Sequence, residues 1–349
     1  MASAEQLKAL LKSHIEGDEG RFFSIAMQVA AHEAKLGHGK LAEELRDMID
    51  SAKSQSQTTG FANNLVPLNK PRGELVGLLS VSYPKIRLAD MILDERVSEK
   101  LKRTIKEQRL FGKLREHGLS PRRKLLLVGQ PGTGKTMTAS VLAAELGIPL
   151  FLVRLDSLIT KFMGETASKL RQVFDAVGNV RGVYFFDEFD AIGSQRGMAN
   201  DVGEIRRVLN SFLQMIDQDQ SNSVIIAATN HPEILDYALF RRFDDVIEYG
   251  LPSQEQIAAM LKRRLVGYKS GKLAWRKIAE EAAGLSYAEI SRAADEAIKN
   301  SIIREHASIA EGDLIRMLAE RKLMRHKLKL TDNNEKGRLS SHAGSTTTK

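Results

Sequence analysis

Residues 125–136 read LLLVGQPGTGKT, and this stretch decides the fold. Its first four residues are apolar, as in a buried strand, and the next eight match the pattern GxxxxGK[ST]. A segment of helical character follows from about Lys135. A strand, a glycine-rich loop and a helix in this order surround phosphate oxygens with backbone N–H groups, and the helix N-terminus favours negative charge. The stretch therefore predicts a P-loop nucleotide-binding fold, and a glycine-rich turn without a ligand is the weaker alternative.

The loop also predicts individual contacts with a nucleoside triphosphate. Lys135 is expected to reach the β- and γ-phosphates, and the hydroxyl of Thr136 is expected to bind Mg²⁺. The residues predicted to bind the nucleotide here are Gly129, Pro131, Gly132, Thr133, Gly134, Lys135, Thr136 and Met137.

Further apolar runs alternate with helical segments after this loop. They lie at 150–155, 182–187 and 223–230. Continuous apolar strands that alternate with helices predict a parallel sheet with helices on both faces. The predicted fold class is therefore α/β, a P-loop NTPase sheet that is followed by a small helical lid and preceded by a short helical bundle.

Polar residues stand at the ends of two of these runs. Asp187 and Glu188 follow Phe186, and Asn230 ends the next run. The carboxyl ends of parallel strands meet at one edge of a sheet, so these side chains are expected beside the phosphate loop. Asp187 is predicted to hold Mg²⁺, Glu188 to polarise the attacking water as a general base, and Asn230 to reach the γ-phosphate or this water. A capped strand end for the acids and an ordinary turn residue for Asn230 are the alternatives.

The remaining sequence changes in composition along the chain. Apolar residues recur at helical spacing before residue 52, and the run SAKSQSQTTG at 51–60 has no apolar period. Capping-box pairs open helices at Ser253 and at Ser286. The predicted organisation is a helical N-terminal docking domain at 1–52, a flexible linker at 53–73, a large α/β ATPase subdomain at 74–251, a small helical lid at 252–329 and a disordered tail at 330–349.

The composition excludes several classes of site. The 349 residues contain no cysteine, so disulfides, thiolate nucleophiles and cysteine-bound zinc are excluded. The N-terminus shows neither a signal peptide nor a spanning helix, so we expect a cytoplasmic protein that does not associate with a membrane. The net charge of +8 attracts polyanions in general, and a solvated basic face is its favoured interpretation.

Four motifs in a fixed order carry a family resemblance. GQPGTGKT, YFFDEFD, AATN and LDYALFRRFD resemble the Walker A, Walker B, sensor 1 and second-region-of-homology elements of AAA ATPases. The form with adjacent arginines is similar to the group that contains katanin, spastin and fidgetin. In this family such arginines enter the ATP site of the neighbouring subunit, so the resemblance implies that Arg241 and Arg242 are trans-acting arginine fingers. Taken alone, adjacent arginines are ordinary surface charge.

The resemblance implies two further sites. Lys161 and Phe162 resemble the first pore loop, in which an aromatic side chain grips an extended polypeptide. A buried core position is the alternative for Phe162. The stretch GLSYAE at 284–289 resembles the GxxGA[DE] element of the lid, which implies that Ala288 packs near adenine; Tyr287 stands where glycine is usual.

Three functions are compatible with these patterns. The resemblance favours protein remodelling or unfolding by a homo-oligomeric ring, most often a hexamer, that hydrolyses ATP with Mg²⁺ and pulls polypeptide through a central pore. A partner protein is expected to dock on the N-terminal helices. The alternative is an AAA ATPase that acts on nucleic acid as a loader or helicase, although no DNA-binding helix-turn-helix is recognisable. The third, ATP binding without turnover, conflicts with Lys135, Glu188 and Arg242.

Overall fold

The computed structural model describes residues 19–58, 75–158, 163–192, 201–235, 237–268, 273–304 and 308–343. Contacts divide the chain into two compact units, Met1–Leu68 and Asn69–Lys349. Among the described residues, no helix combines the length and the apolar character that a membrane span requires.

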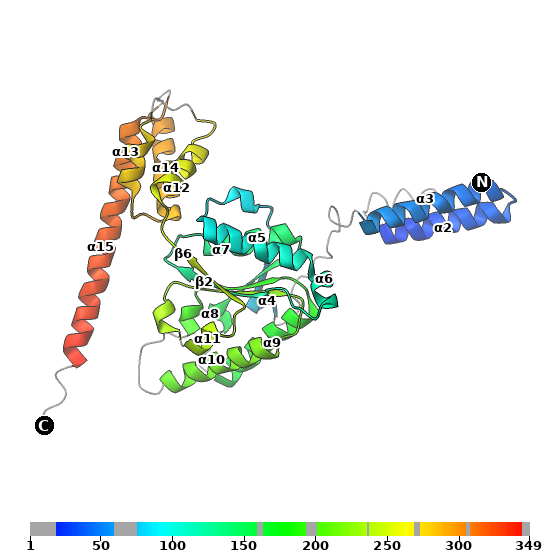
Figure 1. Ribbon diagram of the computed structural model, residues 1–349, viewed down its shortest axis with the longest axis horizontal. Helices are drawn as coiled ribbons and strands as arrows, with labels where there is room; N and C mark the ends of the chain where they lie inside the picture. The colour runs from blue at the N-terminus through cyan, green and yellow to red at the C-terminus, as the bar shows by residue number, and fades with distance from the viewer. Residues whose placement is uncertain are drawn as a thin grey trace. The chain divides into compact units, whose positions relative to one another are not determined.

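The first unit contains a pair of helices, α2 (Glu19–Lys35) and α3 (Gly39–Thr58), that pack against each other (Figure 1). The chain turns between them at Gly37, whose φ of 86° lies in the left-handed region that favours glycine. Among the residues of the pair whose burial is described, Ala30, Glu33, Ala42 and Ile49 are buried. The helical pattern is confirmed over this stretch, and the helix predicted before it lies outside the described residues.

α3 continues further than the sequence predicts. Residues 53–58 are helical, whereas this stretch is predicted to open a flexible linker. Ala52, Lys53 and Gln55 are good helix formers, so a helix that has already begun extends through them without an apolar face.

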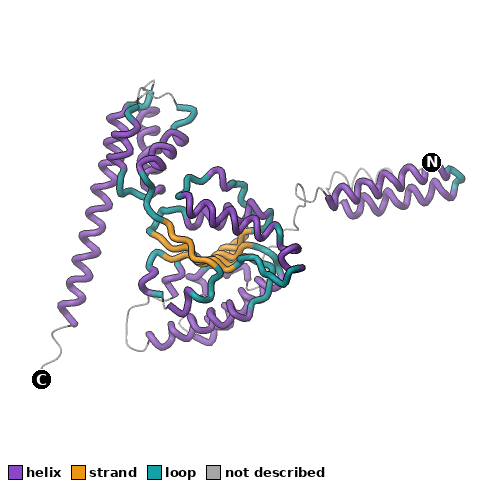
Figure 2. The backbone as a smooth tube through the Cα atoms, viewed as in Figure 1, coloured by secondary structure: helices purple, strands orange, loops and turns teal. Residues whose placement is uncertain are grey.

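Six strands among the described residues form one sheet in the second unit (Figure 2). In chain order they are β1 (Leu79–Ser82), β2 (Lys124–Gly129), β3 (Leu150–Val153), β4 (Val183–Phe186), β5 (Val224–Thr229) and β6 (Asp245–Tyr249). Their order in the sheet is β1-β3-β4-β5-β2-β6. β1 runs antiparallel to β3, and all other neighbours are parallel. The carboxyl ends of β2, β5 and β4 therefore lie next to one another, as the α/β prediction requires.

The two edge strands were not among the predicted ones. β1 is only four residues long, and β6 carries Asp245 and Glu248, so neither is a continuous apolar run. An edge strand has one neighbour and need not be apolar on both faces, which explains why a search for continuous apolar runs finds only the four interior strands.

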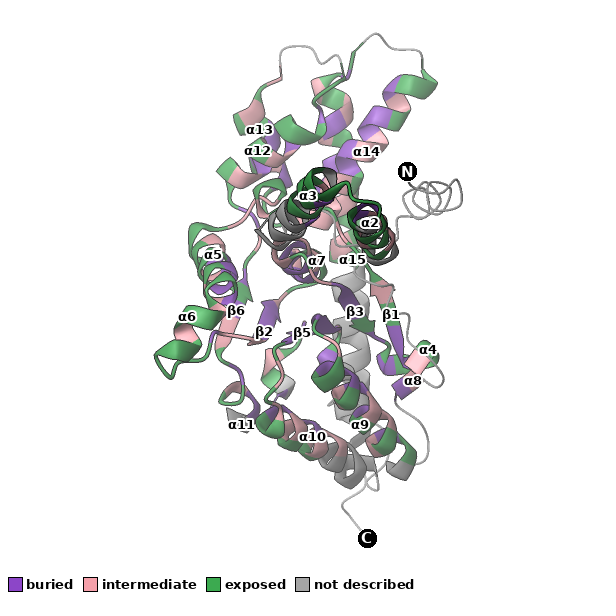
Figure 3. Cartoon of the chain, turned by 90° about the vertical axis from the view of Figure 1, so that its right-hand side faces the viewer, coloured by how far each residue is buried: buried purple, intermediate pink, exposed green. Residues whose placement is uncertain are grey.

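Helices cover both faces of this sheet (Figure 1). The helices before the lid are α4 (Leu75–Leu78), α5 (Glu95–Arg109), α6 (Phe111–Glu116), α7 (Lys135–Leu146), α8 (Leu155–Leu158), α9 (Met163–Asn179), α10 (Asp201–Gln218) and α11 (Tyr237–Phe240), with short 3-10 turns η1 (Leu88–Asp90), η2 (Phe189–Ile192) and η3 (Pro232–Ile234). Leu125 and Leu127 of β2 pack with α5 and α7 on one face, whereas Leu126 packs with α9 and α10 on the other. The interior strands are therefore buried on both faces along most of their length (Figure 3), whereas Leu152 of β3 is exposed.

A cluster of four phenylalanines lies beneath the end of β4. Phe212 of α10 is at its centre, and its ring lies 5.2 Å from Phe186 of β4, 4.5 Å from Phe189 of η2 and 5.7 Å from Phe174 of α9. The contacts with Phe174 and Phe186 are edge-to-face, a favoured arrangement of aromatic rings. This phenylalanine cluster joins two helices to the strand end that carries Asp187 and Glu188.

Four helices form the lid after β6. They are α12 (Gln254–Arg264), α13 (Trp275–Ala282), α14 (Tyr287–Ile303) and α15 (Glu311–Ala343), and they share a hydrophobic core of their own. Both predicted capping boxes are present: Ser253 pairs with Gln256 at the start of α12, and Ser286 pairs with Glu289 at the start of α14.

The last helix differs from the predicted tail. α15 is helical to Ala343, so residues 330–343 are not the disordered segment that the polar sequence predicts. Low apolar content argues against a packed core but does not by itself exclude a helix that continues from the preceding turns. Residues 344–349 lie outside the described part of the chain.

Candidate functional site

The phosphate loop connects β2 to α7. Gly132 and Gly134 have φ values of 77° and 107°, a region that other residues rarely adopt. The Thr133 hydroxyl donates to the carbonyl of Gln130 at 2.8 Å, which closes the loop on itself. α7 begins at Lys135, directly after Gly134, so the backbone N–H groups of its first turn point toward the loop. This arrangement suits an anion at the N-terminus of α7.

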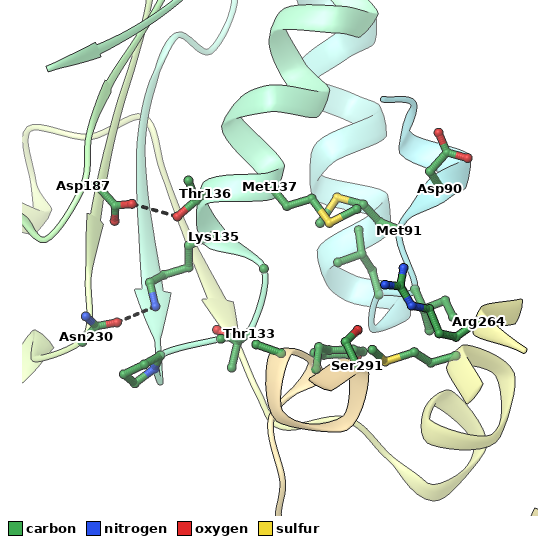
Figure 4. A pocket seen from close by; sticks show the side chains of 18 of the residues that line it. Asp90, Met91, Thr133, Lys135, Thr136, Met137, Asp187, Asn230, Arg264 and Ser291 are labelled. Atoms are coloured by element: carbon green, nitrogen blue, oxygen red, sulfur yellow. Dashed lines mark hydrogen bonds between the residues drawn. The ribbon is translucent and has the colours of Figure 1, made fainter. Parts of the chain in front are cut away.

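Lys135 is held inside the loop by three acceptors. Its ammonium donates to the carbonyls of Gly129 at 2.6 Å and Gln130 at 3.0 Å, and to Oδ1 of Asn230 at 2.7 Å (Figure 4). Burial lowers the pKa of Lys135, and the carboxylates of Asp187 and Asp190 act in the opposite direction. The structure thus brings Lys135 and Asn230, two predicted site residues 95 positions apart, into direct contact.

Thr136 and Asp187 form the second contact between predicted site residues. The Thr136 hydroxyl donates to Oδ2 of Asp187 at 2.7 Å (Figure 4). A hydroxyl and a carboxylate at this separation provide two oxygen ligands of the kind that Mg²⁺ prefers. No group of three or more potential metal-ligating side chains occurs in the described part of the chain.

Glu188 adopts an unusual backbone conformation. Its φ is 50°, and it is the one described residue other than glycine with a positive φ. Its N–H donates to Oδ1 of Asp187 at 3.0 Å. Such a conformation costs about 1 kcal/mol and is retained where the surroundings impose it. Here it turns the chain after β4 so that both Asp187 and Glu188 line the same cavity.

Asp190 is a buried carboxylate to which the sequence assigned no role. Its Oδ1 accepts hydrogen bonds from the Thr229 hydroxyl at 3.0 Å and from the Asn230 N–H at 3.3 Å. Asp190 therefore fixes the end of β5 to the segment after β4 and holds Asn230 beside Lys135. The available signal was a third acid, three residues after Asp187, together with a threonine directly before Asn230.

A cavity of about 680 Å³ opens in front of these residues. Its phosphate side includes ten of the predicted residues, namely Pro131, Gly132, Thr133, Gly134, Lys135, Thr136, Met137, Asp187, Glu188 and Asn230. Gly129 does not line it, although its carbonyl accepts from Lys135. The cavity is large enough for a nucleotide, because small-molecule sites usually have volumes of about 300–1,000 Å³.

The other side of the cavity is more apolar and comes partly from the lid. Met91, Ile92 and Leu93 line it before α5, and Met260, Tyr287 and Ala288 line it from α12 and α14. Ala288 is among these lining residues, and its packing near adenine stays a prediction. Burial raises the pKa of Tyr287 to about 12, and its hydroxyl donates to Gln256 at 3.1 Å. Tyr287 is therefore a neutral side chain that fills part of the apolar wall.

The lid touches the phosphate loop directly. The N–H of Ala288 donates to the carbonyl of Gly132 at 3.1 Å. A Cβ on Gly132 would lie 2.8 Å from Oγ of Ser286 and 2.9 Å from Cβ of Ala288, so the contact requires glycine at this position. The start of α14 and the phosphate loop therefore form one seam, which we call the lid–loop seam.

The predicted arginine fingers lie apart from this cavity. Neither Arg241 nor Arg242, which follow α11, is among its lining residues. The side chain of Arg242 is about half exposed and forms an ion pair with Asp217 of α10 at 2.8 Å. The predicted pore-loop residues Lys161 and Phe162 lie outside the described residues.

Comparison with known proteins agrees with this geometry. Residues 125–251 match the family described as "ATPase family associated with various cellular activities (AAA)". The fold is similar to the crystal structure of the FIGL-1 AAA domain, with a TM-score of 0.57 and 24% identity over 74% of this chain and 89% of that one.

Relatives cover different shares of the chain. The chain is 33% identical, over 61% of its length, to the ATP-dependent zinc metalloprotease FtsH 4 of Sphaerobacter thermophilus. It is 40% identical, over 40% of its length, to a putative 26S proteasome regulatory subunit homolog of Methanothermobacter thermautotrophicus. These matches span only 34% and 39% of the relatives' own lengths. A third relative, the uncharacterized AAA family ATPase y4kL of Sinorhizobium fredii, is 36% identical over 92% of this chain and 96% of its own length. With a relative matched almost from end to end, the chain belongs to the AAA family of ATPases and is an ATP hydrolase.

Proposed function

We propose that this ATPase assembles into a homo-oligomeric ring, a hexamer, and uses Mg²⁺-dependent ATP hydrolysis to pull polypeptides through a central pore, which remodels or unfolds proteins. One observation carries the proposal. The predicted binding and hydrolysis residues meet at one cavity, whereas Arg241 and Arg242 do not line it. If the arginine fingers of a chain lie away from its own ATP site, they can supply the missing guanidinium to the site of a neighbouring subunit.

The triphosphate is proposed to lie against the phosphate loop. Lys135 then exchanges its contacts with the loop carbonyls and Asn230 for phosphate oxygens. Thr136 and Asp187 are the proposed ligands of Mg²⁺, because their oxygens already lie 2.7 Å apart. When bound, Mg²⁺ neutralises charge on the phosphates.

Glu188 is the proposed general base. Its carboxylate accepts a proton from the water that attacks the γ-phosphate, while Asn230 orients that water. Asp190 keeps Asn230 in place through the backbone N–H at 3.3 Å. Both groups line the same cavity as Lys135, so proton acceptance and charge stabilisation occur on the same face of the substrate.

The arginine finger is proposed to come from a neighbour, because the arginines that line the cavity, Arg263 and Arg264, pair with Asp90 and Asp295. Arg242 of one subunit would leave Asp217 and approach the phosphates bound by the next subunit, with Arg241 beside it. A guanidinium in this position stabilises the charge of the transition state. ATP would therefore hold two subunits together, and hydrolysis would weaken that interface.

A polypeptide substrate is supported by the relatives. Two of them are named as an ATP-dependent zinc metalloprotease and a putative 26S proteasome regulatory subunit homolog, and both names refer to protein breakdown. Lys161 and Phe162 are proposed to grip the polypeptide, and α2 and α3 to dock a partner protein.

Mixing two inactive variants tests the shared site. Glu188→Gln and Arg242→Ala should each lose turnover, since one lacks the base and the other the finger. In a mixture, an Arg242→Ala subunit that precedes a Glu188→Gln subunit has an intact base and receives an intact finger, so about a quarter of the sites regain activity if equal amounts assemble at random. Turnover that stays absent in the mixture would contradict completion by a neighbour.

Stimulation of ATP turnover identifies the substrate class. An unfolded polypeptide should stimulate the wild type, and Phe162→Ala should lose the stimulation while it keeps basal turnover. Tyr268→Ala, which removes an exposed aromatic ring on the lid, serves as the matched control. Stimulation by DNA that falls steeply with salt would instead favour action on nucleic acid.

A further inference from the structure

We propose that Arg325 is a positioning residue that holds the lid–loop seam together and thereby sets the affinity of the site for ATP. Arg325 lies on α15, far along the chain from every residue of the phosphate loop. It does not line the cavity, so it acts through its contacts and not by touching the nucleotide. The inference rests on the proposed binding of ATP in this cavity.

The guanidinium of Arg325 bridges the two sides of the seam. On the loop side, Nη2 donates to Oε1 of Gln130 at 2.6 Å. On the lid side, Nη1 donates to the carbonyl of Gly284 and lies 3.3 Å from Oε2 of Glu289. The side chain of Arg325 is only 19% exposed, so these contacts are partly shielded from water. A planar guanidinium is well suited to such a bridge, because its donors point in fixed directions.

Glu289 connects this bridge to the wall of the cavity. The same Oε2 that faces Arg325 accepts from the N–H and from the hydroxyl of Ser286, each at 2.7 Å. Ser286 is the N-cap of α14, whose first turn supplies Tyr287 and Ala288 to the cavity. Arg325 thus fixes the capping box that positions these two lining residues.

The loop side of the seam is linked directly to Lys135, the residue proposed to bind the phosphates. Gln130 belongs to the phosphate loop, and its carbonyl accepts from the Lys135 ammonium at 3.0 Å. Gly132 of the same loop accepts from the N–H of Ala288. The seam is therefore held by one backbone hydrogen bond and by the Arg325 bridge, and loss of the bridge leaves the single hydrogen bond.

Another arginine of α15, Arg316, has different partners. Arg316 pairs with Asp313 of its own helix at 3.1 Å, and the same carboxylate lies 3.6 Å from Arg304, so this contact does not involve the lid–loop seam. Arg325 instead reaches three residues outside its helix, on both sides of the seam. Arg316 is therefore the matched control for removal of a guanidinium from α15.

The test measures nucleotide affinity and turnover of the full-length chain. The probe is a fluorescent N-methylanthraniloyl derivative of ATP, and the proteins are wild type, Arg325→Ala, Gln130→Ala, the double variant and Arg316→Ala. Arg325→Ala should raise the Kd of the probe and the KM for ATP about fivefold or more, with kcat at saturating ATP within about twofold of wild type. Arg316→Ala should bind like the wild type.

The double variant separates the bridge from a general loss of structure. If Arg325 acts through Gln130, the double variant binds the probe about as weakly as Arg325→Ala alone. A merely structural role would lower the melting temperature of the nucleotide-free protein and leave Kd and KM unchanged, which would overturn the inference.

The remaining outcomes are also decisive. Equal Kd values for wild type and Arg325→Ala, or effects of the two substitutions that multiply in the double variant, would overturn the inference. Should Arg325→Ala not fold, Gln130→Ala alone decides, and an unchanged Kd in that variant counts against the bridge. A wild type that does not bind the probe would instead overturn the assignment of the cavity to ATP.

Discussion

Glu188 combines a proposed chemical role with a strained backbone. A residue with a Cβ is disfavoured at its φ of 50°, and glycine is not. Glu188→Gly should therefore be about 1 kcal/mol more stable than Glu188→Ala, as measured by denaturant unfolding. Both variants should lose turnover by about a hundredfold or more, because neither has a base. Equal stability of the two variants would show that the backbone relaxes around position 188.

Lys135 should make ATP binding sensitive to alkaline pH. Its pKa is lowered by burial from the ordinary 10.5, so the folded ligand-free protein loses this proton more readily than the unfolded chain. As a result, its contribution to the free energy of unfolding rises with pH between the lowered pKa and 10.5. ATP affinity should fall over the same window, since only the ammonium form attracts phosphate.

A titration of Kd upward from about pH 8, where the phosphates are already ionised, tests this expectation. Lys135→Met is the control and should bind weakly at every pH. An affinity that stays constant up to pH 10.5 would contradict a lowered pKa.

At the scale of residues, local patterns predicted the groups that lie close in the sequence to a motif. Lys135, Thr136, Asp187 and Asn230 were all expected at one edge of a parallel sheet, and they meet there. Arg325 was not expected, because its partners are distant in the chain and depend on how α15 packs on the lid. No spacing in the sequence encodes such a contact.

At the scale of elements, the lid–loop seam should tolerate no side chain at Gly132. An added Cβ would lie within 2.9 Å of Ala288 at a φ of 77°, so Gly132→Ala should destabilise the protein by about 1–3 kcal/mol and raise KM for ATP. Gly178→Ala in α9 is the control, since its Cβ meets nothing within 4 Å and alanine favours a helix. Thermal unfolding and ATPase assays on both variants test the difference, and matching behaviour would argue against the seam.

Helices and strands differed in how well the sequence predicted them. The capping boxes of α12 and α14 are local, so Ser253 and Ser286 marked their starts correctly. The four interior strands were found because they are continuous apolar runs that are largely buried. β1 and β6 depend on their single neighbours, and the end of α15 has few apolar residues, so apolar patterning could not reveal them.

At the scale of the whole molecule, the two compact units should be separable. Every member of the three hydrophobic clusters lies at residue 75 or later, so the unit Asn69–Lys349 contains its own core. A chain of residues 69–349 should therefore unfold cooperatively near the melting temperature of the full chain and keep its ATPase activity within about twofold. Circular dichroism melts and turnover assays measure both, and an unfolded fragment would show that residues 1–68 contribute to the core.

The phenylalanine cluster has a mechanical consequence. Edge-to-face rings packed at 5.2 and 5.7 Å leave little free volume, and a close-packed interior transmits strain instead of absorbing it. A small displacement at the end of β4 should therefore shift α9 and α10 together, because Phe212 contacts both Phe186 and Phe174. α9 starts at Met163, immediately after Phe162 in the chain, so a shift of α9 would displace the residue that we propose to grip the polypeptide.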